Sequence, residues 1–217
     1  MVRRVLSVTN AGPDSRVLSL GCGIADTEIL LAPHVRHITA IDLSPSAIRQ
    51  ARQDAQHLSN FELIEGTLDN APLDGREFDT VIAIFFLHHL PDGELGRTIR
   101  RIHRHLRPGG AFYGLDPSRF RLSGALGRLI VPKLMKRYQT PDERELDPRG
   151  TAALFRQSGF EARHDYFDFA SSPIAGLFPS WRAGYLASRA ADNVIVRLPL
   201  LRRLGSNFEI IARRSAP

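Results

Sequence analysis

Hydrophobic positions along the chain gather in short runs, each followed by a polar or glycine-rich turn. We expect five of these runs to be strands, at residues 17–20, 38–41, 61–64, 80–86 and 111–115. Most of their residues are apolar, and Gly, Pro or Asp bounds each run, as is typical of strands covered on both faces of a parallel sheet.

Helical spacing of apolar residues separates the strands. It predicts helices at residues 26–31 and 93–105, and Ser44-Pro45 begins another that extends to about His57. Further along, we expect a helix over 147–155, a strand over 160–169 and a last strand over 207–212. Alternating strands and helices predict right-handed crossovers and a ligand site beyond the carboxyl ends of the strands.

Two segments interrupt this alternation. Residues 117–146 mix Arg and Lys with Leu and Ile, which predicts a basic amphipathic helix, and residues 171–204 carry aromatic residues and leucines. We expect both to be inserts that form a lid over the active edge of the sheet and contact the acceptor. The whole chain, 1–217, is expected to be one domain with a cofactor-binding core at 16–116.

The composition says little about the class of protein. The chain has 43% hydrophobic and 24% charged residues, as ordinary globular proteins do. It lacks a signal-peptide pattern, and its single cysteine, Cys22, excludes an intramolecular disulfide, so we expect a cytoplasmic protein. A net charge of +6 permits a nucleic acid, an acidic ligand or an anionic membrane as partner and selects none of them.

The most informative stretch follows the first predicted strand. Gly21 and Gly23 form a turn into a helix, and Asp42 ends the next strand, which is how parallel α/β sheets hold an adenosine-containing cofactor. A dinucleotide fingerprint would need a third glycine where this chain has Asp26. A carboxylate there repels pyrophosphate, and it suits a ligand that carries an ammonium or sulfonium group.

These residues resemble the first motif of the class I S-adenosylmethionine-dependent methyltransferases. Later motifs of that family resemble, in the same order, Phe78–Ala83, Leu87–Asp92, Leu106–Gly110 and Ser158–Phe160. The resemblance implies an α/β fold with a Rossmann-like, doubly wound seven-stranded sheet whose last strand is antiparallel. It also implies S-adenosylmethionine as cofactor and methyl transfer to a small or lipid-like acceptor, with a hydroxyl oxygen favoured over nitrogen or carbon.

The resemblance also implies the cofactor-binding residues. The expected set is Ser19, Gly21, Cys22, Gly23, Asp26, Asp42, Leu43, Thr67, Leu68 and Phe85. Asp42 would accept hydrogen bonds from the ribose hydroxyls. Ser19 and Thr67 stand where relatives have acids, which predicts weaker binding; Asp26 either replaces the missing charge near the methionine ammonium or is a solvated helix-start residue.

Three residues are candidates for the catalytic step, and each has a structural alternative. A neutral histidine can take a proton from a hydroxyl, and the analogy ranks His89 slightly ahead of His88. In the alternative interpretation, both histidines only shape the segment and lead into the helix that follows. Asp116 either orients the acceptor or its base, or caps the turn that follows it. The spacing of the histidines predicts no metal site.

Two other functions stay open. The basic inserts favour a nucleic-acid methyltransferase electrostatically, but the segment after the fourth strand lacks the pattern used on exocyclic amines, so a nucleic-acid partner is disfavoured. A non-catalytic cofactor-binding or membrane-surface protein is the second alternative, because Arg197–Leu204 could meet an anionic bilayer. The sequence leaves the oligomeric state open.

Overall fold

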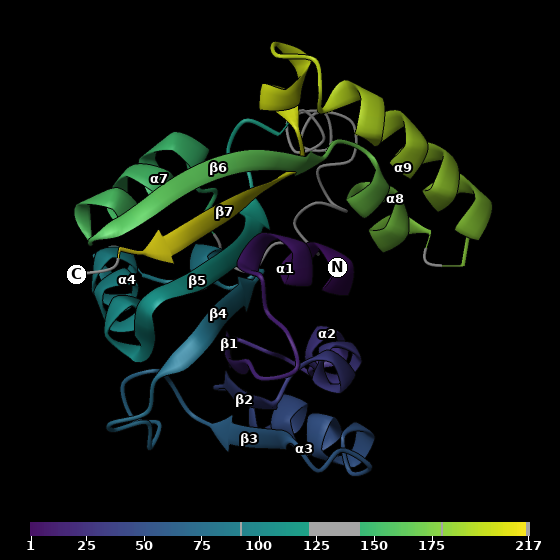
Figure 1. Ribbon diagram of the computed structural model, residues 1–217. Coiled ribbons are helices and arrows are strands. Elements are labelled where there is room, and N and C mark those ends of the chain that lie inside the picture. Colours follow the sequence, from purple (N-terminus) through teal and green to yellow (C-terminus); the bar gives the residue numbers. More distant parts are fainter. Residues whose placement is uncertain (92, 122–143, 179, 216–217) are drawn as a thin grey trace.

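A computed structural model of the chain describes residues 1–91, 93–121, 144–178 and 180–215 (Figure 1). Its centre is a seven-stranded sheet. The strands are β1 (Arg16–Leu20), β2 (His37–Asp42), β3 (Phe61–Glu65), β4 (Phe78–Ile84), β5 (Leu106–Pro117), β6 (Phe160–Asp168) and β7 (Asn207–Arg214).

The strand order is β3-β2-β1-β4-β5-β7-β6. β1 pairs in parallel with both β2 and β4, so the chain reverses its direction of winding at β1, which is where open α/β sheets bind ligands. β7 runs antiparallel to β5 and β6. The predicted Rossmann-like fold with an antiparallel last strand is confirmed.

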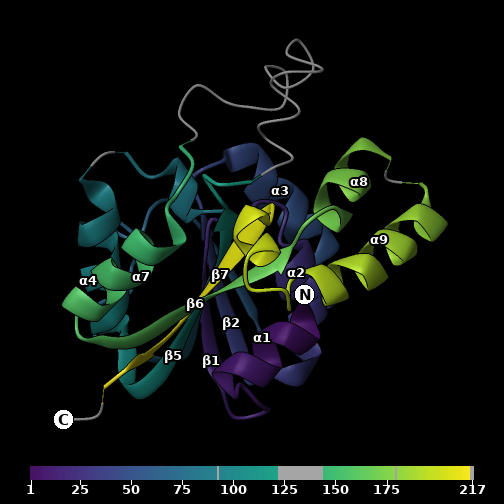
Figure 2. The same cartoon turned by 90° about the horizontal axis from the view of Figure 1, so that it is seen from above.

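Helices cover both faces of the sheet (Figures 1 and 2). They are α1 (Val2–Thr9), α2 (Asp26–Leu31), α3 (Pro45–Asp54), α4 (Glu94–His105), α7 (Pro148–Gln157), α8 (Ser171–Leu177) and α9 (Arg182–Ile195), with 3₁₀ turns η1 (Ala32–His34), η2 (Leu87–His89) and η3 (Leu201–Leu204). α3 starts as predicted, because the Ser44 hydroxyl accepts from the Ala47 N–H and Pro45 occupies the first turn.

The apolar core lies in two layers, one on each face of the sheet. Ile99 of α4 and Phe155 of α7 pack on one face, together with Phe112 of β5. Val5 of α1 and Leu31 of α2 pack on the other. Because both faces are covered, the edge formed by the carboxyl ends of the parallel strands is left to carry polar chemistry.

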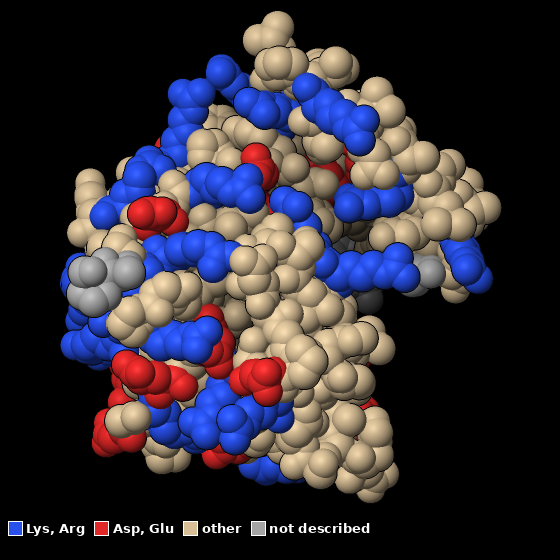
Figure 3. Space-filling model, viewed as in Figure 1, with Lys and Arg blue, Asp and Glu red and all other residues tan. Residues whose placement is uncertain are grey.

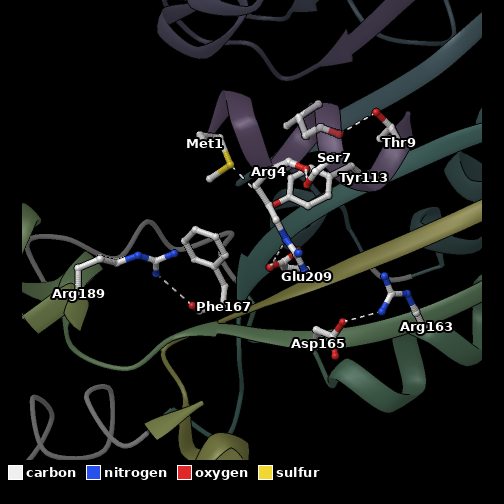
Figure 4. Close-up of polar contacts among 11 residues, drawn as sticks. Met1, Arg4, Ser7, Thr9, Tyr113, Arg163, Asp165, Phe167, Arg189 and Glu209 are labelled. Atoms are coloured by element: carbon white, nitrogen blue, oxygen red, sulfur yellow. Dashed lines mark hydrogen bonds and ion pairs between the residues drawn. The ribbon is translucent and has the colours of Figure 1, made fainter. Parts of the chain in front are cut away.

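Helix α1 was not predicted from the sequence; it rests on β5, and its Arg4 side chain reaches β7 (Figure 4). Its Arg4 forms an ion pair with the buried Glu209 carboxylate of β7, with Nε and Oε2 2.8 Å apart. The Tyr113 hydroxyl of β5 lies 3.6 Å from the Met1 sulfur. These contacts join residues that are 205 and 112 positions apart, and therefore only the folded chain shows them.

Two predicted boundaries differ from the structure. β4 ends at Ile84 rather than residue 86, because Phe85 has a φ of 54°, a conformation that strand residues do not adopt. The basic amphipathic helix expected within 117–146 falls largely on residues 122–143, outside the described ranges. The second predicted insert contains α8, α9 and η3.

Within the described ranges, no helix combines the length and the apolar composition needed to cross a bilayer.

Candidate functional site

The glycine loop after β1 is held by the neighbouring strand β2. The N–H groups of Gly21 and Cys22 both donate to the carbonyl of Ile41, at 2.8 and 3.1 Å. The Asp42 carboxylate accepts from the Gly23 N–H at 2.7 Å and, through its other oxygen, from the Ser44 N–H at 2.8 Å. One acid therefore fixes both the loop and the start of α3.

Gly21 needs to be glycine for two reasons. Its φ of 66° lies in the left-handed region, which favours glycine. A Cβ at this position would also lie 2.4 Å from the Phe86 ring, which follows β4. The loop after β1 thus packs directly against the segment that carries the two histidines.

Carboxylates lie around this loop, and one of them is buried. Glu28 of α2 has only 3% of its surface exposed, and its carboxylate accepts a hydrogen bond of 2.6 Å from the Ser19 hydroxyl. Burial raises the pKa of Glu28, and the charges of Asp26 and Asp42 raise it further. Burial, Glu28 and Asp42 together also raise the pKa of the Cys22 thiol well above its usual range.

Sequence reasoning missed Glu28. It looked for the missing acid of the first motif at Asp26, which the structure places on the exposed first turn of α2. The available signal was an acid among the apolar residues of a short helix. Ser19 and Glu28 together put a carboxylate under the loop, although the strand position that carries the acid in relatives holds a serine.

The charges of Asp26, Glu28 and Asp42 indicate which kind of ligand the loop can bind. Among the described residues, no ion pair joins an arginine or lysine to Asp26, Glu28 or Asp42. Three carboxylates without a basic partner favour a cation and disfavour a diphosphate. The loop therefore suits the positively charged nucleoside predicted from the sequence.

The remaining predicted cofactor residues lie at the carboxyl ends of β2, β3 and β4. Leu43 is exposed after β2. Thr67 is exposed after β3, and its N–H and hydroxyl donate to the Asn70 side chain at 2.7 and 3.2 Å. Leu68 packs partly on the core. Phe85 is exposed after β4, and its positive φ marks the local strain common at ligand sites.

His88 and Asp116 form a buried pair at the ends of β4 and β5. His88 Nδ1 lies 2.8 Å from Asp116 Oδ1, and the backbone N–H of His88 donates to the same oxygen at 3.1 Å. Because that oxygen accepts the backbone bond, we assign the ring proton to Nδ1, which leaves Nε2 free to accept a proton. Burial raises the pKa of Asp116, and the bonds from His88 offset part of this rise.

Asp116 therefore anchors the 3₁₀ turn η2; its carboxylate reaches back to His88 rather than capping the turn after β5. His89 is exposed, and its ring centroid lies 4.0 Å from that of His88. The Arg144 N–H, where the first insert returns to the described chain, donates to the His88 carbonyl at 3.1 Å. Both histidines and the end of this insert thus meet at one edge.

The described residues contain no group of three or more potential metal ligands.

The sheet order, the glycine loop after β1 and the acid at the end of β2 are typical of α/β proteins that bind a nucleoside cofactor. Residues 17–110 match the methyltransferase domain model. A Staphylococcus epidermidis protein named demethylmenaquinone methyltransferase is 32% identical over 119 residues, 54% of this chain and 48% of that protein. A Listeria monocytogenes protein of the same name is 29% identical, covering 67% of this chain and 70% of that protein.

The fold agrees with the sequence match. An S-adenosylmethionine-dependent methyltransferase from Mesorhizobium loti superposes with a TM-score of 0.68 at 19% identity, over 98% of this chain and 95% of that chain. In sequence and in fold, the chain is therefore similar to S-adenosylmethionine-dependent methyltransferases, as its motifs predict. It spans about half the length of the Staphylococcus relatives.

Proposed function

We propose that this chain transfers the methyl group of S-adenosylmethionine to a hydroxyl oxygen of a small or lipid-like organic acceptor. The observation that carries this proposal is the His88–Asp116 pair, a positioned proton acceptor at the sheet edge that also carries the glycine loop. A methyltransferase acting on an acidic hydroxyl needs such an acceptor in addition to a cofactor site.

The loop residues account for the cofactor. When bound, S-adenosylmethionine supplies an electrophilic methyl group. Gly21 and Gly23 would let the backbone run close to the methionine part, Asp42 would accept hydrogen bonds from the ribose hydroxyls, and Glu28 would offset the positive charge from beneath the loop. Thr67 and Leu68 would border the adenine, and Phe85 the methionine amine, as expected from their places after β3 and β4.

His88 would act as the general base. Nε2 would accept the hydroxyl proton as the oxygen bonds to the methyl carbon and the carbon–sulfur bond breaks, so that S-adenosylhomocysteine leaves. Asp116 would stabilise the resulting imidazolium and hold the ring in place. The pair is almost dry, with 5% of His88 and 1% of Asp116 exposed. Asp116 therefore lies in a low-dielectric setting, where its charge acts strongly on the ring.

A lipid-like acceptor is favoured by two observations. The curated relatives are named for demethylmenaquinone, a lipid-like quinone. Large apolar side chains are also exposed in the insert between β6 and β7, which begins and ends at the same sheet edge as His88. A reduced quinone carries hydroxyl groups, so removal of a proton by His88 would activate such an acceptor.

A nucleic-acid acceptor is the second candidate, favoured by a groove of about 570 Å³ lined mainly by α4. Its basic residues are Arg97, Arg100, Arg101, His103 and Arg104. However, the groove also includes Ser158 at the end of α7, just before β6 begins, so it extends toward the amino-terminal edge of the sheet, away from His88. A salt-sensitive gel shift that Arg100→Gln weakens would revive this candidate.

We expect Glu28→Gln to weaken the binding of S-adenosylmethionine about tenfold, because the substitution removes a buried carboxylate near the ligand cation. 5′-Methylthioadenosine, which lacks the amino-acid part, should bind unchanged. Since burial raises the pKa of Glu28, cofactor binding should release a proton, and affinity should rise with pH in the parent but not in the variant. Calorimetry in two buffers of different ionisation enthalpy measures this.

Asp26→Asn is the matched control, since Asp26 lies on the same helix but is exposed. It should change the affinity less than threefold, as expected for a screened surface charge. Equal weakening of both nucleosides by Glu28→Gln would mean that the loop itself is damaged and would contradict the proposed role.

The proposed function is tested in two steps. Calorimetry should detect binding of S-adenosylmethionine and of S-adenosylhomocysteine, and not of NAD⁺; folded protein that binds neither nucleoside would refute the cofactor site. Methyl transfer from labelled cofactor is then assayed with a reduced demethylated naphthoquinone in detergent micelles and with a soluble catechol. An O-methyl product supports the proposal, a C-methyl product moves the acceptor atom to carbon, and binding without transfer favours the non-catalytic alternative.

A further inference from the structure

Exposed apolar side chains concentrate in the segment that joins β6 to β7, residues 171–204. We call the outer face of this segment the α8–α9–η3 surface. Its large exposed hydrophobic residues are Phe178, Trp181, Tyr185, Leu186, Val194, Leu198, Leu200, Leu201 and Leu204. Leu200 alone has 78% of its surface exposed. Patches of this kind usually mark a binding surface.

The charged residues of the same segment are almost all positive. Arg182, Arg197, Arg202 and Arg203 are exposed among the apolar residues. Asp192, the single acid of residues 171–204, is buried, and its two oxygens accept from the N–H groups of Ala170 and Ser171 at 2.9 Å each. In Figure 3, blue side chains border this part of the molecule, while red ones gather mainly over the opposite end of the view.

The structure also fixes which side of α9 faces away from the body. Asp192 turns inward to cap α8. Arg189 turns inward as well: its guanidinium donates to the Phe167 carbonyl of β6 at 3.2 Å and lies 4.6 Å from the centre of the Phe167 ring (Figure 4). The buried residues of α9 are Gly184 and Asp192, whereas Arg182, Leu186 and Val194 are exposed, and Arg197, which follows the helix, is exposed as well.

We propose that the α8–α9–η3 surface docks the protein on an anionic lipid bilayer. Leucine and aromatic side chains would enter the headgroup region, and the arginines would lie at the level of the lipid phosphates, the arrangement of interfacial amphipathic helices. Positive charge and apolar area occur together here, which suits this partner. A symmetric contact with a second copy would instead place arginines against arginines.

The α8–α9–η3 surface is connected to the sheet edge that carries the candidate site. The segment leaves the sheet after Asp168 and returns at Asn207, which pairs with both Asp168 and Pro117 at the edge that carries Asp116. A docked bilayer would therefore lie near the acceptor end of the site. This consequence rests on the proposed lipid-like acceptor, whereas docking itself does not.

The test is sedimentation of the full chain with vesicles of phosphatidylcholine alone or with 30% phosphatidylglycerol, without cofactor or acceptor. We expect binding to the anionic vesicles that falls with salt. The triple variant Arg197→Gln, Arg202→Gln, Arg203→Gln should lower partitioning by about 100-fold, since each interfacial arginine contributes about fivefold. Leu200→Ser should lower it by about fivefold.

Matched variants elsewhere on the surface control for charge and apolar area. Arg3→Gln, Arg36→Gln, Arg49→Gln removes the same charge, and Leu30→Ser changes a leucine that is 66% exposed on α2. Both should partition as the parent does. Equal losses from test and control variants, equal binding to neutral vesicles, or no sedimentation would overturn the proposal.

A concentration-dependent dimer that Leu200→Ser abolishes would likewise overturn it in favour of self-association. Light scattering after gel filtration separates that outcome from vesicle binding. Calorimetry with S-adenosylmethionine on the same variants distinguishes the docking proposal from the proposed function. A variant that loses docking but still binds the cofactor affects only the docking surface.

Discussion

Asp42→Ala is expected to weaken S-adenosylmethionine binding by about 100-fold or more, measured by calorimetry. The Asp42 carboxylate would accept two ribose hydroxyl bonds, and bonds to a charged group contribute about 1.5–3 kcal/mol each. The substitution also releases the Gly23 N–H and the Ser44 N–H, which Asp42 now holds at 2.7 and 2.8 Å. Both the ligand contact and the shape of the loop are lost together.

A comparison of nucleosides separates these two effects. The parent should bind adenosine more tightly than 2′,3′-dideoxyadenosine, and this preference should vanish in Asp42→Ala if the carboxylate contacts the ribose. Asp26→Asn serves as the control and should keep the preference. A variant that retains the parent's affinity for the cofactor would contradict the ribose assignment, and a melting curve verifies that the variant is folded.

The sequence was sufficient to predict the sheet, and it indicated the sheet edge at which the candidate residues lie. Short apolar runs that end at Gly or Asp occur where the structure has β1, β2 and β5, because a parallel strand buried on both faces leaves polar residues only at its ends. The carboxyl ends of parallel strands meet at one edge. Gly21, Asp42 and Asp116 could thus be expected at one edge without coordinates, and their joint role in a site stays a prediction.

Side-chain pairing across that edge could not be predicted. The adjacent histidines His88 and His89 are indistinguishable in a sequence pattern, and analogy ranked His89 first. In the structure, η2 rotates His88 inward to Asp116 and leaves His89 exposed. That ranking remains untested, but the proposed mechanism uses His88 because its ring is oriented by a buried carboxylate.

The contribution of Glu28 escaped prediction for a related reason. α2 has six residues, too few for its apolar pattern to show which side faces the sheet. Its rotation is set by the packing of Leu31 on the core, which turns Glu28 toward Ser19 of β1. The carboxyl group that the first motif lacks at Ser19 is thus present beneath the loop, on a different element.

His88→Ala is expected to lower kcat for methyl transfer by about 10²–10⁴-fold, the usual contribution of a general base, with cofactor affinity unchanged within about twofold. The residue lies beside the loop but is assigned no contact with the cofactor. His89→Ala is the matched control and should keep most of the activity. Product formation from labelled S-adenosylmethionine, with calorimetry on each variant, measures both quantities.

The dependence of the rate on pH distinguishes a base from a merely structural histidine. The His88–Asp116 pair must be without its extra proton to accept one, so kcat of the parent should fall as pH decreases. Burial raises the pKa of Asp116, so this acidic limb should lie at a higher pH than that of an exposed carboxyl. His88→Ala should lose this acidic limb.

Asp116→Asn should retain the limb in part and keep the affinity for the acceptor, because the imidazole remains but loses the charge that stabilises its protonated form. If His88→Ala keeps the pH profile of the parent, or if its cofactor affinity falls as far as its rate, the histidine maintains the shape of η2 and another group removes the proton. An acceptor whose hydroxyl is already ionised needs no base and gives a final comparison. It should therefore restore much of the rate that His88→Ala loses only if that substitution removes the base.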